Sequence, residues 1–132
     1  MATVTALRVQ ETNHRNNVRM TGEVSSVAVA RTLRDGAPVV TWRLIVRRAL
    51  VRPGGANFDT IDCISWEAPV RRSAPRWQLG DLIECEGSLH RRFWRTPGGT
   101  VSRCEVEVSQ ARRVGRPRAQ PGAGPAPPQA SS

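Results

Sequence analysis

The sequence predicts an all-β domain, a small barrel of five strands capped at one end by a single short helix. Between Asn17 and Val114, apolar and polar residues alternate with the two-residue period of strands rather than the period of helices. Glycine- and proline-rich turns divide this alternation into five runs, and only one interval between runs has room for a helix. A chain of 132 residues is long enough for one such domain with its own core.

The five strands are expected at residues 17–33, 39–48, 58–66, 82–95 and 101–114. Gly22 interrupts the first strand, which predicts a bulge or sharp bend at this position. Asp35-Gly36 is a turn signal between the first two strands. Trp42 lies on the apolar face of the second strand and is expected in the core. The alternation of the fifth strand slips near Gln110, which predicts a bulge there.

The helix is expected between the third and fourth strands, within residues 67–77. Pro69 suits its first turn and Pro75 ends it early, because proline is tolerated only at the start of a helix. Val70 and Trp77 are placed to close the bottom of the barrel. The order β-β-β-α-β-β, with a long bent first strand, is the layout of the OB-fold, a five-stranded Greek-key barrel.

The charge balance favours a polyanionic partner. The chain has 20 basic residues, all arginine, against 11 acidic ones, for a net charge of +9. Arginine pairs bidentately with phosphate and stacks on bases, so nucleic acid is the first candidate and an anionic membrane the second. No apolar run is long enough to span a membrane and no secretory signal is visible, so we expect a cytoplasmic, nucleoid-associated protein without membrane contact.

Composition divides the chain into three parts. Residues 1–16 are expected to be a flexible segment, residues 17–114 the folded domain, and residues 115–132 a disordered tail. The tail is rich in proline, glycine and alanine and has almost no larger apolar side chain. It therefore cannot bury enough apolar area to offset the entropy of ordering.

The most distinctive stretch is residues 80–99, which ends in an arginine-aromatic cluster. Alternation along a strand predicts two faces. If Ile83, Cys85, Leu89 and Phe93 face the core, the residues that point outward are His90, Arg92 and Trp94. An exposed tryptophan between guanidinium groups can stack an unpaired base while the arginines neutralise its phosphates. The alternative is a solvated hairpin tip.

Neither catalysis nor metal binding finds support in the sequence. Asp59 and Asp62 are the only close acid pair near a loop, and their spacing puts them on opposite faces of a strand. His14 and His90 have no partner at ligand spacing. Cys63, Cys85 and Cys104 are widely spaced, which favours buried, reduced thiols over a metal site. We therefore expect no enzyme activity, cofactor, metal or small-molecule substrate.

Five segments in order resemble bacterial single-stranded-DNA-binding (SSB) proteins, most closely the SSB-like paralogues of actinobacteria. They read N-N-V-R-M-T-G-E-V, D-G-A-P-V-V-T-W-R-L-I-V-R-R, D-T-I-D-C-I-S-W, G-D-L-I-E-C-E-G-S-L-H-R-R-F-W and C-E-V-E-V-S-Q-A-R-R-V. The resemblance covers residues 17–114. It implies non-catalytic coating of single-stranded DNA by an oligomer of OB domains, usually a tetramer.

The resemblance also implies binding residues. Trp94 and Trp66 match two of the family's stacking aromatics, whereas the other two positions fall near Leu50 and Thr60, which carry no ring. The arginines expected to contact phosphates are Arg43, Arg47, Arg48, Arg91, Arg92 and Arg95. Each missing platform forfeits about 1–3 kcal/mol per base, so weaker and more salt-sensitive binding is expected.

The last residues, P-A-P-P-Q-A-S-S, lack the acidic tip through which the family recruits other enzymes. Recruitment through that tip is therefore expected to be absent, and an accessory paralogue in replication, repair or recombination is favoured. Two alternatives stay open. One is an interaction protein that pairs with another SSB subunit or a replication factor and binds little DNA. The other is a binder of single-stranded RNA.

Overall fold

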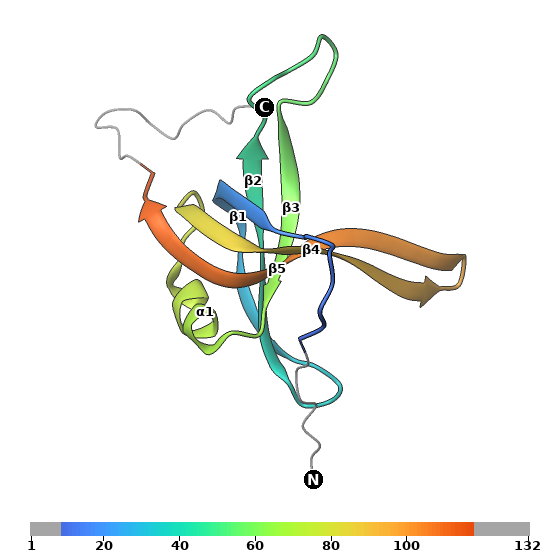
Figure 1. Cartoon of the computed structure of the whole chain (residues 1–132). Coiled ribbons are helices and arrows are strands. Elements are labelled where there is room, and N and C mark those ends of the chain that lie inside the picture. Colours follow the sequence, from blue (N-terminus) through green and yellow to red (C-terminus); the bar gives the residue numbers. More distant parts are fainter. Residues whose placement is uncertain (1–8, 118–132) are drawn as a thin grey trace.

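A computed structural model describes residues 9–117 as five strands and one short helical segment (Figure 1). The strands are β1 (Val18–Thr32), β2 (Pro38–Arg47), β3 (Phe58–Ser65), β4 (Leu82–Thr96) and β5 (Gly99–Gly115). Between β3 and β4 lie the helix α1 (Ala68–Ser73) and a turn of 3-10 helix, η1 (Ala74–Arg76). The predicted elements and their order are confirmed. The predicted tail lies outside the described residues from position 118 onward.

The strands close into a barrel in the order β1-β2-β3-β5-β4. All neighbouring pairs are antiparallel except β3 and β5, which run parallel through Cys63 opposite Val106 and Ile64 opposite Glu107. This is the OB-fold that the sequence predicts. Within residues 9–117, no helix is long and apolar enough to cross a membrane.

The core lies inside the barrel, with the helical segment closing one end. Trp42 and Trp77 are buried and pack edge to face, with ring centroids 5.2 Å apart, as expected for two core tryptophans. Val70 of α1 joins the same cluster. Cys63 and Cys85 are buried there too, and hydrogen bonding to Cys85 together with burial raises the pKa of the Cys63 thiol. The Cys63 thiol is therefore held in the protonated form.

The bend in β1 differs from the prediction. Pairing through Gly22 is regular, and the irregularities lie between Val24 and Ser26 and between Ser26 and Val29. Glycine is needed at position 22 because a Cβ there would lie 2.5 Å from the carbonyl oxygen of Ile45 in β2. The bulge predicted near Gln110 is confirmed, because Glu86 pairs with Gln110 while Gly87 pairs with Val108.

The second half of β4 leaves the barrel. Up to Gly87, β4 pairs with both β1 and β5, but from Ser88 onward it pairs with β5 alone. Residues 88–107 therefore form a two-stranded hairpin, here called the arm, which projects from the barrel (Figure 1). A Cβ on Gly87 would overlap the carbonyl oxygen of Glu107, so the close crossing at the base of the arm requires glycine.

The arm corrects two expectations. Ile83 and Cys85 are buried, but Leu89 and Phe93 are exposed, so the prediction that all four face a core is wrong for the last two. Cys104 is exposed as well, against the prediction of buried thiols. The reason is the same in each case: these three residues lie where the hairpin extends past the part of β4 that pairs with β1, so the barrel core does not cover their side chains.

Candidate nucleic-acid interface

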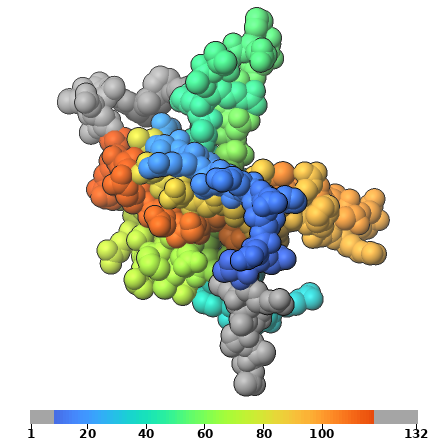
Figure 2. Space-filling model, viewed as in Figure 1, coloured from blue at the N-terminus to red at the C-terminus, as the bar shows by residue number. Residues whose placement is uncertain are grey.

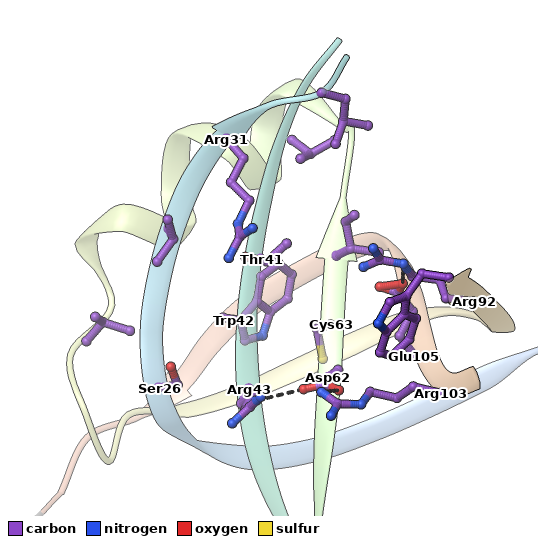
Figure 3. Close-up of a pocket in the computed structure, with 16 residues that line it drawn as sticks. Ser26, Arg31, Thr41, Trp42, Arg43, Asp62, Cys63, Arg92, Arg103 and Glu105 are labelled. Atoms are coloured by element: carbon purple, nitrogen blue, oxygen red, sulfur yellow. Dashed lines mark hydrogen bonds and ion pairs between the residues drawn. The ribbon is translucent and has the colours of Figure 1, made fainter. Parts of the chain in front are cut away.

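A groove of about 640 Å³ runs between the outer faces of β1–β3 and one face of the arm (Figure 3). Residues that point out of the barrel form its floor, including Thr41 and Arg43 of β2 and Asp62 of β3. Trp94 and Arg92 of the arm form one wall. The β1–β2 turn, the loop at residues 48–57 and the arm project around the barrel (Figure 2).

Trp94 is a half-buried ring in this wall, with 39% of its surface exposed. Its cross-strand neighbour on the same face is Val101. The guanidinium carbon of Arg103 lies 5.9 Å from the centroid of the indole, a cation–π contact. One part of the ring is therefore held against Arg103 while a substantial area remains open for another planar group.

Asp62 links two arginines on the groove floor. Arg43 Nε donates to Asp62 Oδ1 at 2.7 Å, and Arg103 Nη1 donates to Asp62 Oδ2 at 3.1 Å. Because Arg103 also faces Trp94, the carboxylate orients a guanidinium against the aromatic ring. Asp62 also cancels one of the positive charges that it brings together.

A second carboxylate, that of Glu105, pairs with one arginine of the arm. Arg92 Nε lies 3.4 Å from Glu105 Oε1, and the Glu105 side chain is 8% exposed. Burial raises the pKa of Glu105, and the positive charge of Arg92 partly opposes this shift. Nearby Asp62 raises the pKa further, whereas His90 lowers it.

The groove is nevertheless net positive. Its charged lining residues are four arginines and two carboxylates, a balance of two positive charges: Arg31, Arg43, Arg92, Arg103, Asp62 and Glu105. Arg31 has no acidic partner within 4 Å among residues 9–117. The groove thus combines an aromatic face with guanidinium groups, and the described residues show no cluster of three side chains suited to a metal ion.

The structure brings three of the sequence-predicted binding residues into the groove: Trp94, Arg92 and Arg43. The other five lie outside its lining. Trp66 follows β3, is 38% exposed, and accepts a hydrogen bond from Arg71 Nε through its carbonyl oxygen. Arg47 lies at the end of β2 and Arg48 in the loop that follows.

Arg48 is already engaged by an acid. Its Nε and Nη2 donate to the two carboxylate oxygens of Asp59 at 2.9 and 2.7 Å. This bidentate bond lowers the pKa of Asp59 and raises that of Arg48. Arg91 and Arg95 lie on the face of the arm that points away from Trp94, because alternate residues of a strand face opposite sides.

Sequence reasoning missed Arg103, Glu105 and the paired role of Asp62. The position of Arg103 could have been predicted from the hairpin turn. Pairing outward from the Pro97-Gly98 turn places Arg103 opposite Arg92. No comparable signal located Asp62, because its partners Arg43 and Arg103 come from two other strands whose registers are set by the closed barrel.

No protein-family model matches the chain. A curated relative is the single-stranded DNA-binding protein of Caldanaerobacter subterraneus subsp. tengcongensis, which is 28% identical over 113 residues, covering 85% of this chain and 75% of the relative. The chain is thus similar to a single-stranded DNA-binding (SSB) protein over most of its length.

Two solved structures of SSB proteins share the fold at lower identity. The small single-stranded DNA-binding protein from Streptomyces coelicolor matches with a TM-score of 0.59 and 15% identity, over 76% of this chain and 96% of that one. The Plasmodium falciparum SSB, in a complex with ssDNA, matches with a TM-score of 0.66 and 16% identity, over 80% of this chain and 98% of that one. At these identities the likeness supports the OB-fold alone.

Proposed function

We propose that this chain binds single-stranded DNA in the groove, without catalysis. The observation that carries the proposal is the half-exposed ring of Trp94 beside Arg92 and Arg103. An unpaired base stacks on an open indole face, and the neighbouring guanidinium groups neutralise the phosphates on either side. Duplex DNA keeps its bases stacked on one another, so it offers no ring to this platform.

Phosphate contacts extend from the groove floor. Arg31 and Arg43 lie across the groove from Trp94, so the backbone of a bound strand follows the outer faces of β1 and β2. Trp66 supplies a second stacking ring after the end of β3, with Arg47 and Arg48 beyond the groove at the end of β2. The binding roles of Trp66, Arg47 and Arg48 are proposed from the family resemblance.

We further propose an accessory role in replication, repair or recombination, as a homo-oligomer in the cytoplasm. Leu50 and Thr60, which replace two family platforms, are exposed and offer no ring for stacking. Asp62 and Glu105 also form ion pairs with three of the four groove arginines in the free protein. Both features favour weaker binding than a chain with four stacking platforms would show.

The test is titration of a labelled oligo-dT, followed by fluorescence anisotropy. Trp94→Ala should weaken binding by about 1–3 kcal/mol, the value of one stacked base. Trp77→Phe is the control, because Trp77 is buried in the core and does not line the groove. Affinity unchanged by Trp94→Ala would refute the stacking site.

The salt dependence of the same titration reports the phosphate contacts. Each neutralised phosphate of a single strand contributes a slope of about −0.7 in log affinity against log salt. The groove should thus contribute about −0.7 if the carboxylates keep their three arginines and only Arg31 reaches phosphate, and about −2.8 if all four arginines reach phosphate. Parallel titrations with rU and with a duplex competitor separate DNA binding, RNA binding and the interaction-protein alternative, for which all affinities would be negligible.

A further inference from the structure

The arm has a second face, which the groove does not use. Across the arm, Arg91 pairs with Cys104, Phe93 with Ser102 and Arg95 with Thr100. Residues paired in this way share a face, and that face is opposite to the one carrying Trp94. It is here called the reverse face, and its residues are Leu89, Arg91, Phe93, Arg95, Thr100, Ser102 and Cys104.

Phe93 is the most exposed aromatic ring among the described residues. Its exposed fraction is 65%, against 39% for Trp94. The residue directly opposite is the small Ser102, so no large side chain across the strand covers the ring. An aromatic side chain left this open gains little from folding and presents its surface to a ligand.

The arginines around Phe93 differ from those in the groove. Arg91 donates to Ser102 Oγ at 3.2 Å and to Cys104 Sγ at 3.5 Å, which holds its guanidinium beside the position opposite Phe93. Neither partner is a carboxylate, so no acid offsets the positive charge of Arg91. Arg95 has no acid within 4 Å in residues 9–117.

The two faces of the arm therefore differ in charge. The groove face carries Glu105 and Glu107 as well as Arg92 and Arg103, whereas the reverse face has two arginines and no carboxylate. An aromatic ring between two uncompensated guanidinium groups suits a base flanked by phosphates. A second copy of the arm does not fit, because it would bring Arg91 and Arg95 against like charges.

We propose that Phe93, Arg91 and Arg95 form a second contact for single-stranded nucleic acid. This inference rests on the proposed function of the groove. A strand stacked on Trp94 continues around the outer edge of β4 and places a later base on Phe93. Beyond Gly87 that edge pairs with no strand in the described part of the chain, and only the Asn16 side chain bonds to it, at Leu89. The path around the arm is therefore open.

The test compares two lengths of oligo-dT. The short one lies near the lower end of the about 4–16 nucleotides that an OB domain covers, and the long one exceeds the upper end. Phe93→Leu removes the ring but keeps an apolar side chain. It should weaken binding of the long oligomer about 5- to 30-fold and leave the short one within about 2-fold, because only the long strand reaches the reverse face.

The arginines give an independent measure. The double variant Arg91→Gln, Arg95→Gln should make the salt slope for the long oligomer shallower by about 1.4, the contribution of two phosphates. The slope for the short oligomer should not change. Leu79→Ala is the control for losing an exposed apolar side chain, since Leu79 lies before β4 and outside the arm.

The outcomes separate the two proposals. If the wild-type chain binds neither oligomer, the proposed function fails. If it binds both and Trp94→Ala weakens both, but Phe93→Leu changes neither, only the reverse-face contact is overturned. A change in sedimentation of the free protein on Phe93→Leu, without a change in affinity, would overturn it in favour of a protein contact. Binding of two short oligomers per chain, with Phe93→Leu removing one, would support the site with a second strand as its occupant.

Photocrosslinking locates the base directly. A long oligomer carrying 5-iodouracil, irradiated on the wild-type protein and digested, should yield crosslinked peptides at both Trp94 and Phe93. The short oligomer should yield the Trp94 product predominantly. Crosslinking of the long oligomer that never reaches residues 89–95 except at Trp94 would contradict the proposed path.

Discussion

Single carboxylates set how much positive charge the groove offers to a ligand. Asp62 holds both Arg43 and Arg103, and one of these guanidiniums faces the Trp94 ring. A phosphate arriving at either arginine must compete with this carboxylate. Exposed ion pairs are weak, so a strand with several phosphates can displace Asp62 from these arginines.

Asp62→Asn should therefore strengthen binding of oligo-dT about 3- to 10-fold at low salt, because it frees two arginines and removes a negative charge near the phosphates. Anisotropy titration measures the change. Glu84→Gln is the matched control: Glu84 also pairs with two arginines, Arg19 and Arg112, but lies outside the groove. Equal gains from both variants, or a loss from Asp62→Asn, would contradict a local role for Asp62.

Glu105 should make binding sensitive to pH. Burial raises the pKa of this carboxyl, and a phosphate bound beside Arg92 would raise it further. Protonation removes one negative charge from the groove and releases Arg92, so the affinity for oligo-dT should rise as the pH falls through the range in which Glu105 gains its proton.

The measurement is the oligo-dT affinity between about pH 7.5 and about pH 5, in a His90→Gln background that removes the neighbouring imidazole. Glu105→Gln should bind more tightly near neutrality and show a flatter profile. A profile equally steep in Glu105→Gln would assign the pH dependence to another group.

At the scale of elements, the arm depends on its base. A two-stranded ribbon alone is marginally stable in water. The Asn16 side chain makes the pair of hydrogen bonds that a neighbouring strand would make. Its Nδ2 donates to the carbonyl oxygen of Leu89 at 2.7 Å, and its Oδ1 accepts from the Leu89 amide at 2.8 Å. The segment before β1 thus fastens the edge of the arm just beyond the barrel.

Asn16→Ala should loosen the arm without unfolding the barrel. Hydrogen exchange measured by NMR should be faster at the Leu89 amide by about 5-fold or more, as expected for loss of a bond worth about 1 kcal/mol. Core amides such as that of Leu44 serve as the internal control. Unchanged exchange at Leu89 would show that the arm does not rely on Asn16.

The end of β3 is fastened by a buried hydroxyl. Ser65 Oγ donates to the carbonyl oxygen of Val108 at 2.7 Å and accepts from the Glu67 amide at 3.2 Å. Ser65→Ala leaves both groups without this partner, so it should lower the free energy of unfolding by about 1–3 kcal/mol. Chemical denaturation measures the loss, with the exposed Ser26→Thr as a mild reference substitution. A loss below about 0.5 kcal/mol would contradict this role.

At the scale of the whole molecule, alternation and turn chemistry were sufficient to predict the barrel. They placed Trp42 and Trp77 in the core because a half-buried strand and a capping helix each leave a periodic apolar face. They misplaced Phe93 for a physical reason. Alternation tells which residues share a face, but not whether another layer covers that face, and the arm extends beyond the barrel.

The candidate site was only partly predictable. Trp94 and Arg92 belong to one short segment, so their common face follows from the sequence. The carboxylates that restrain the arginines do not, because Arg43, Asp62 and Arg103 meet only when β2, β3 and β5 are in register. Long-range register is a property of the closed barrel rather than of any one strand.

In the proposed complex a single strand lies in the groove against Trp94. The most direct test is an NMR titration of the wild-type protein with oligo-dT, read at the indole N–H signals and at the backbone amides. The Trp94 indole and the amides of Arg43 and Asp62 should shift, while the buried Trp77 indole and the amide of Glu84 should stay in place. Shifts confined to Glu84 and its neighbours, with the Trp94 indole unmoved, would contradict binding in the groove.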